Sequence, residues 1–190
     1  MDFGPPEADA LVYSGALTYS VNFDAVDFFL REVFPLIQAK RPTVKLSVTG
    51  KLEGVPIDRL PANDGLVLTG YLDDVRPTVA RSWACVVPLR VGGGTRLKIL
   101  EALALGTPVV STSVGAEGLK VTPGVDILIA DEPTEFADAT LRLLEDPGLR
   151  AELAANGRRL VRERYDWDQI GEQLDRFLRQ VAKNVVRRPE

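Results

Sequence analysis

The chain has 190 residues, enough to bury one good core, so one compact domain is the default expectation. Its formal net charge of −4 argues against nucleic acid as a partner, because binding to a phosphate backbone usually needs a basic face. The chain contains no histidine, which excludes Ser-His-Asp or Cys-His nucleophile arrangements and histidine-ligated metal sites within it.

Targeting and redox signals are sparse in this sequence. No apolar run is long enough to span a bilayer, and the N-terminus lacks a basic segment followed by an apolar one. We therefore expect no transmembrane segment, no signal peptide and a cytoplasmic location. The single cysteine, Cys85, lies in an apolar run, so it is expected to be a small core residue rather than part of a disulfide or zinc cluster.

Short apolar strands alternate with helical patterns along the chain. Strands are expected at residues 10–13, 44–50, 65–70, 84–89, 109–112 and 126–130. Helices are expected at residues 24–40, 74–82, 95–105, 133–145, 149–164 and 167–186. Pro35 lies inside the first helical pattern and predicts a kink or an early stop there. This alternation predicts an α/β fold with a Rossmann-like parallel sheet and helices on both faces.

The most informative segment is residues 88–101, which reads as a buried strand, a loop with three glycines and the first turns of a helix. Glycines let a backbone approach a ligand closely, and a helix N-terminus offers unpaired N–H groups and a positive dipole end. This geometry binds phosphate. The segment matches neither the Walker sequence nor the dinucleotide fingerprint. Three glycines alone fit a flexible turn equally well, so the residues that follow decide the interpretation.

Glycines follow several of the expected strands. Gly15, Gly70, the run 92–94 and Gly115 each come just after a strand. In open α/β sheets, ligands bind at the carboxyl ends of the strands. Four glycine signals at one sheet edge therefore favour a nucleotide crevice over four unrelated turns.

The segment 88–118 resembles the donor-binding half of the family 4 glycosyltransferases, which retain the anomeric configuration and have the GT-B fold. The likeness is carried by residues 88–90, 92–96, Lys98, 100–102, 106–110 and 115–118. It extends back to residues 70–75 and to 13–15 with Asn22 and residues 24–26, so it covers nearly the whole chain. The resemblance implies that the chain is one Rossmann-like half of a GT-B enzyme.

The resemblance also implies roles for individual residues. Glu101 would accept hydrogen bonds from the donor's ribose, Arg96 and Lys98 would bind the diphosphate, and the loop at Tyr71 would lie near the nucleobase. The plainer alternatives are a surface carboxylate near a helix N-terminus, solvated cations and a tyrosine that caps the core. The residues expected to bind the donor are Gly15, Tyr71, Leu72, Arg90, Gly92, Gly93, Gly94, Thr95, Arg96, Lys98 and Glu101.

The sequence departs from the commoner family pattern at two places. That pattern has a glutamate eight residues before Glu101, where it contacts the donor sugar, and this chain has Gly93 there. The usual phosphate clamp after the first strand is also missing, because Ala16 follows Gly15 and no lysine comes before Lys40. The phosphate cations are therefore expected from Arg96 and Lys98.

The implied reaction is transfer of a sugar from a nucleotide-diphosphate sugar to an acceptor, of the hexosyltransferase type and with retention. No metal ion or other cofactor is expected, and catalytic residues are not assigned.

The chain is too short for both GT-B halves. We treat residues 1–190 as one domain. A helix from about 165 to 190 is expected to cross to the missing N-terminal acceptor half. Peripheral contact with a membrane through that missing half remains an open alternative. The isolated domain is expected to be inactive. The alternatives are a GT-B nucleotide-sugar epimerase and a non-catalytic nucleotide-sugar-binding module.

Overall fold

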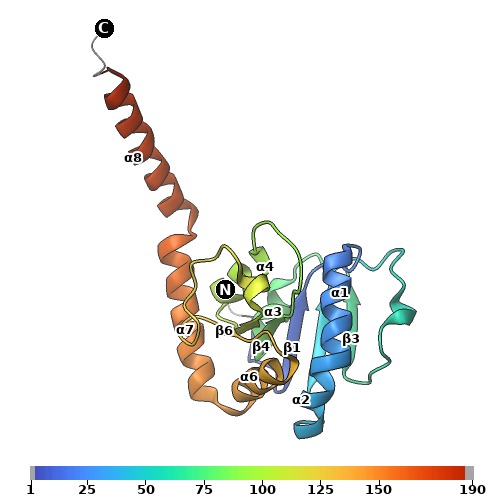
Figure 1. Cartoon of the computed structure of the whole chain (residues 1–190). Helices are drawn as coiled ribbons and strands as arrows, with labels where there is room; N and C mark the ends of the chain where they lie inside the picture. Colours follow the sequence, from blue (N-terminus) through green and yellow to red (C-terminus); the bar gives the residue numbers. More distant parts are fainter. Residues whose placement is uncertain (1–2, 187–190) are drawn as a thin grey trace.

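A six-stranded parallel sheet forms the centre of the protein (Figure 1). The computed structural model describes residues 3–186. The strands lie in the order β3-β2-β1-β4-β5-β6 and all pair in parallel. Their bounds are β1 Ala10–Ser14, β2 Lys45–Thr49, β3 Leu66–Gly70, β4 Ala84–Val87, β5 Val109–Ser111 and β6 Leu128–Ile129. The expected parallel α/β sheet is confirmed.

The direction of strand addition reverses between β1 and β4, which lie side by side with Leu11 opposite Ala84. From β1 the chain moves outward to β2 and β3, and from β4 it moves outward to β5 and β6. The loops that leave β1 and β4 therefore diverge, and such a switch point opens a crevice at the carboxyl edge of the sheet. Gly15 and the three-glycine loop follow these two strands.

Helices cover both faces of the sheet, as expected. On one face α6 (Pro133–Glu145) packs against α2 (Phe34–Lys40), and α1 (Ser20–Phe28) lies in the same layer. On the other face α4 (Leu97–Leu105) packs against α3 (Arg76–Arg81) and α7 (Pro147–Arg164). Because helices lie on both sides, all four residues of β4 are buried. Cys85 among them is fully buried, and burial raises the pKa of its thiol to about 12.

The helical pattern expected at residues 24–40 differs in detail from the structure. The helix begins four residues earlier, at Ser20, and passes through a π-helical turn, Phe29–Val33, into α2. Of the two alternatives expected at Pro35, the early stop is wrong, because Pro35 lies in the first turn of α2, where a missing N–H is tolerated. The irregularity falls just before the proline instead. Phe29 packs on Phe34 and Phe136, with ring centroids 5.7 and 5.9 Å apart, so these aromatic residues belong to the core.

Several other boundaries shift by a few residues. The helix expected from residue 95 begins at Leu97, because Gly94 is left-handed (φ +85°) and Arg96 has non-helical backbone angles. It ends at Gly106, whose φ of +79° suits a glycine C-cap. The loop expected after β5 contains one helical turn, α5 (Ser113–Ala116), which begins where the Thr112 side chain accepts a hydrogen bond from the N–H of Gly115. A 3-10 turn, Ile57–Arg59, lies before β3.

The last helix, α8 (Trp167–Val186), has the bounds expected from the sequence and extends away from the body of the protein (Figure 1). It contacts the rest of the structure mainly through α7. Residues 1–2 and 187–190 of the expected domain lie outside the described residues. Within residues 3–186, no helix is both long enough and apolar enough to cross a membrane.

Candidate functional site

Two adjoining hollows open at the carboxyl edge of the sheet. The strand hollow, about 460 Å³, lies over the ends of β1, β2 and β3 and is lined by Gly15, Gly50, Lys51, Tyr71 and Leu72, among others. The helix hollow, about 620 Å³, lies between α1 and the three-glycine loop. Tyr19 lines both hollows. Together they form one crevice at the point where the strand order reverses, where a Rossmann-like sheet binds ligands.

Lys98 projects from the first turn of α4 into this crevice. Its ammonium donates to the Tyr13 hydroxyl at 2.7 Å and to Oδ1 of Asn22 at 3.0 Å. It also lies 4.0 Å from the centroid of the Tyr13 ring. An ammonium has three N–H groups, and no described residue accepts the third. Burial lowers the pKa of Lys98 to about 8. Lys98 is therefore a partly buried cation with one donor left for a ligand.

Two glycines, Gly15 and Gly50, leave the space that the ammonium of Lys98 occupies. A Cβ atom on Gly15 would lie 2.9 Å from Nζ of Lys98 and 3.0 Å from Nδ2 of Asn22. Gly50, with φ +115°, brings the end of β2 so close to Ala16 that a Cβ there would lie 2.6 Å from the Ala16 backbone. Larger residues at either position would push into the crevice. Close packing of the ends of β1 and β2 thus fixes Lys98 above Gly15.

Arg96 has a different role in the same loop. Its guanidinium is buried, with 6% of the residue exposed, and donates to the carbonyl oxygens of Gly93 and Gly92 at 3.1 Å and of Val114 at 2.8 Å. Oε2 of Glu117 lies 3.4 Å away. One cation therefore ties the glycine loop to α5. Its Nε–H has no partner among the described residues, and Arg96 lines the helix hollow.

Arg90 and Glu101 lie outside the walls of the two hollows. The Arg90 guanidinium is half-exposed and pairs with both carboxylate oxygens of Asp24, at 2.5 and 3.2 Å. It also stacks 4.7 Å above the ring of Phe28. Glu101 lies one helical turn after Lys98 on α4, so the two side chains share a face of the helix. Partial burial raises the pKa of its carboxyl, and Lys98 opposes that shift.

The structure brings most of the expected donor-binding residues to one crevice. Gly15, Tyr71 and Leu72 line the strand hollow, and Gly92, Gly93, Thr95, Arg96 and Lys98 line the helix hollow. Gly94 lies within the same loop and needs its left-handed φ. Their roles toward a ligand stay predictions.

Gly93 stands where the commoner family pattern has a glutamate, and packing does not require a glycine there. Gly93 is exposed, its φ lies outside the left-handed region, and a Cβ there would meet nothing within 4 Å. A side chain would therefore fit at residue 93. Space and backbone geometry do not explain why this chain lacks a carboxylate at that position.

Some residues of the crevice were not singled out as site residues from the sequence. Asn22 accepts from Lys98 and donates through Nδ2 to the Ala16 carbonyl at 2.8 Å. Tyr19 and Lys51 line hollows from loops that follow β1 and β2. Asn22 belongs to the family likeness but was not assigned to the site, because the helix was expected to begin at Asp24, and Lys51 was missed because a lone lysine after a strand carries no motif. Their position directly after strand ends is the signal that could have found them.

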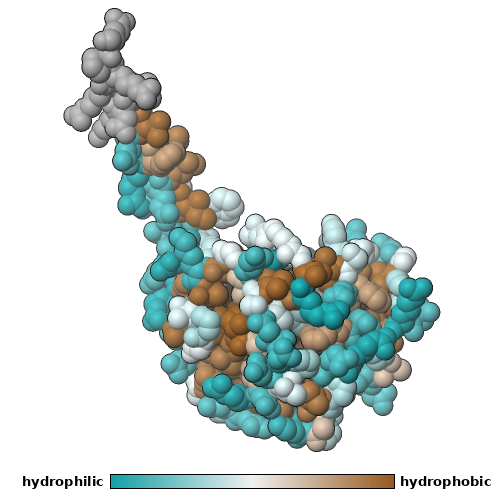
Figure 2. All heavy atoms as spheres, viewed as in Figure 1, coloured by the Kyte–Doolittle hydropathy of each residue, from teal (hydrophilic) through white to brown (hydrophobic). Residues whose placement is uncertain are grey.

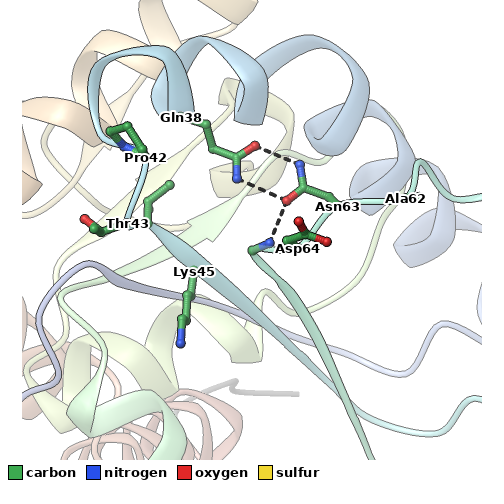
Figure 3. A pocket seen from close by; sticks show the side chains of 9 residues that line it. Gln38, Pro42, Thr43, Lys45, Ala62, Asn63 and Asp64 are labelled. Atoms are coloured by element: carbon green, nitrogen blue, oxygen red, sulfur yellow. Dashed lines mark hydrogen bonds between the residues drawn. The ribbon is translucent and has the colours of Figure 1, made fainter.

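A third hollow, about 650 Å³, lies at the opposite edge of the sheet (Figure 3). There Gln38 and Asn63 exchange hydrogen bonds of 3.1 and 2.7 Å, and Oδ1 of Asn63 also accepts from the N–H of Gly65. The amide groups thus satisfy one another. None of the residues expected to bind the donor lies in this hollow, which is at the amino ends of β2 and β3.

Comparisons with known proteins agree with this architecture. A family model described as glycosyl transferases group 1 matches residues 8–146. The crystal structure of Anabaena HepE in complex with UDP and glucose has a TM-score of 0.73 at 20% identity, covering 90% of this chain and 48% of that one. The C-terminal domain of a glycosyl transferase group 1 family protein from Francisella tularensis has a TM-score of 0.62 at 18% identity, covering 86% and 88%. These likenesses confirm the expected half of a GT-B fold.

A curated relative gives the same picture from sequence. The GDP-mannose-dependent monoacylated alpha-(1-6)-phosphatidylinositol monomannoside mannosyltransferase of Corynebacterium glutamicum is 28% identical over 161 residues, which are 78% of this chain and 42% of that protein. The chain thus spans less than half the length of this relative. Because the family model covers well over half of the residues, the chain belongs to the glycosyl transferases group 1 family.

Proposed function

We propose that the chain is the C-terminal, donor-binding half of a retaining glycosyltransferase of the hexosyltransferase type, which moves a sugar from a nucleotide-diphosphate sugar to an acceptor. The observation that carries the proposal is Lys98, held above Gly15 at the strand-order switch with one N–H unshared. A partly buried cation with a free donor at such a switch point suits a diphosphate.

The chemistry follows from where negative charge develops. When the glycosyl bond breaks, the nucleoside diphosphate leaves with additional negative charge. Lys98, the N–H groups at the start of α4 and the unpaired Nε–H of Arg96 would stabilise that charge electrostatically. The proposal includes no metal ion or other cofactor. It keeps the cytoplasmic location expected from the sequence.

The missing acceptor half is part of the proposal. Apolar side chains follow one side of α8, with polar ones on the other (Figure 2). Exposed fractions on that stripe are 82% for Trp167, 55% for Leu174 and 59% for Phe177. A helix with such a stripe normally packs on a partner surface. We propose that an N-terminal half of the enzyme covers it.

We expect the 190-residue chain alone to bind nucleoside diphosphates weakly and to transfer no sugar. The reason is that the described residues form one sheet with one crevice, so an acceptor and catalytic groups must come from elsewhere. Calorimetry with uridine, guanosine and adenosine diphosphates, followed by a product assay with nucleotide sugars, tests this expectation. Robust turnover by the isolated chain would contradict the need for a second half.

A Glu101→Gln substitution tests the ribose contact. It keeps the shape of the side chain but removes its charge, so nucleotide affinity should fall by about 1–2 kcal/mol if the carboxylate accepts from the ribose hydroxyls. Glu101 lies in the second turn of α4, roughly 6 Å along the axis from its first residue, within reach of a nucleotide held at the helix start. The affinity is measured by calorimetry.

The control for this variant is a dideoxy nucleoside diphosphate, which lacks the two ribose hydroxyls. Its affinity should hardly change on Glu101→Gln. An equal loss for the dideoxy and the normal nucleotide would mean that Glu101 acts through helix packing or through Lys98, and the ribose role would be rejected.

A further inference from the structure

We propose that the strand hollow selects nucleobases that present a carbonyl oxygen at the edge away from the ribose, guanine and uracil, over adenine and cytosine, with Lys51 as the selecting residue and Tyr71 as the stacking surface. This inference rests on the proposed function, because it concerns the base of the same nucleotide donor. It adds a residue that the donor-binding set expected from the sequence does not contain.

The shape of the strand hollow suits a flat ring. Two tyrosines line it, and both are unusually exposed for large aromatic residues, Tyr71 at 66% and Tyr19 at 70%. Exposed aromatic rings in a hollow offer π-faces on which a base can stack. The hollow adjoins the one that contains Lys98, since Tyr19 lines both. A base in the strand hollow could therefore be joined to a diphosphate beside Lys98.

Among the residues that the structure describes, Lys51 is the only cationic one that lines this hollow, and it lies two residues after the end of β2. Its ammonium is 5.9 Å from the centroid of the Tyr71 ring. A base stacked on that ring would lie about 3.5–4 Å above it. The ammonium now lies over that same ring, so a base that stacks on Tyr71 would move it aside toward the edge of the base, which the flexible lysine side chain allows.

The chemistry of an ammonium decides which base edge it accepts. Lysine has three N–H donors and no acceptor. Guanine presents O6 and uracil presents O4, whereas adenine and cytosine present an amino group at the equivalent position. Guanine and adenine both carry N7, but only guanine has a second acceptor beside it. An amino group facing an ammonium leaves donors without acceptors. The selection is therefore for the keto group shared by guanine and uracil.

The test compares the affinities of GDP, UDP, ADP and CDP for the chain by calorimetry. All four carry the same diphosphate, so any general effect of charge cancels in the ratios. We expect GDP and UDP to bind about tenfold more tightly than ADP and CDP, the discrimination that one hydrogen bond to a charged donor supplies. In Lys51→Met this ratio should fall to about one.

The matched control is Lys45→Met. Lys45 is the exposed lysine at the opposite end of the same strand, where it lines the hollow of Figure 3, and its loss should leave the ratio unchanged. Tyr71→Ala should weaken all four nucleotides about tenfold, whereas Tyr71→Phe should retain the affinity because the stacking face is kept. Thermal melting of each variant verifies that it is folded.

The possible results of these measurements distinguish a failure of base selection by Lys51 from a failure of the proposed function. Equal binding of all four nucleotides by the unmodified chain, or a keto preference that survives Lys51→Met, would overturn base selection by Lys51 while leaving the proposed function intact. An equal loss of affinity in Tyr71→Phe and Tyr71→Ala would overturn the stacking role. Failure of every nucleoside diphosphate to bind would overturn the proposed function itself and this inference with it.

Discussion

Replacing Lys98 with methionine should weaken binding of nucleoside diphosphates by about 1.5–3 kcal/mol, roughly 10- to 150-fold. Methionine keeps the length and apolar stem of the side chain but removes the ammonium that faces Gly15. Binding of the corresponding nucleosides should hardly change, because they carry no phosphate. Calorimetry on both ligand types separates the two effects, and a parallel loss for nucleoside and nucleotide would show that Lys98 only shapes the crevice.

The same residue predicts a pH dependence of binding. Burial lowers the pKa of Lys98 to about 8, and the nearby Arg96 adds to that shift, whereas Cys85 and Glu101 oppose it. Below that pH the free protein carries the ammonium, and above it an increasing fraction carries the neutral amine. A diphosphate binds the ammonium more tightly, so affinity should fall as the pH rises from 7 to 9.

Two measurements check this sign. Calorimetry near pH 8 in buffers of different ionisation enthalpy should show proton uptake on binding, since the bound phosphate favours the charged lysine. Lys98→Met should bind with an affinity that is nearly constant between pH 7 and 9, because diphosphate groups are already ionised there. An unchanged pH profile in the variant would assign the dependence to another group.

Much of the fold could be predicted because local and global signals agree. Buried strands such as β4 consist almost wholly of small and branched apolar residues, which suits a strand covered on both faces. Gly106 marks the end of α4 because its left-handed backbone needs a glycine. The order of strands and helices then leaves a parallel sheet as the natural arrangement, and the glycines after β1 and β4 point to its carboxyl edge.

The site was harder to predict because it depends on which way side chains turn. Arg96 and Lys98 look alike in the sequence, two cations beside three glycines. The helix begins only at Leu97, so Arg96 precedes it and turns back onto carbonyl groups, whereas Lys98 points across to β1. Lys51 joins the crevice only through tertiary packing, which no local pattern records. Asn22 is part of the family likeness, but its contact with Lys98 also depends on tertiary packing. The spacing of residues along the chain could predict which loop forms the site. It could not predict that Arg96 would hold the loop together while Lys98 would face the crevice.

Arg96→Ala should destabilise the protein by about 2–4 kcal/mol, because it leaves the carbonyl oxygens of Gly92, Gly93 and Val114 without their charged donor. The glycine loop would lose its tie to α5. Urea unfolding measures the free energy. Arg90→Ala is the matched control, since Arg90 is a half-exposed arginine in the same loop whose pair with Asp24 is worth about 1 kcal/mol or less.

Arg96→Lys distinguishes the charge of Arg96 from its geometry. Lysine keeps the positive charge near Glu117 but lacks the planar fork that reaches three carbonyl groups from one side chain. If the fork holds the loop, Arg96→Lys should recover less than half of the stability lost in Arg96→Ala. Full recovery by lysine would show that a positive charge is sufficient at this position. A loss below about 0.5 kcal/mol in Arg96→Ala would show that the loop keeps its shape without the guanidinium.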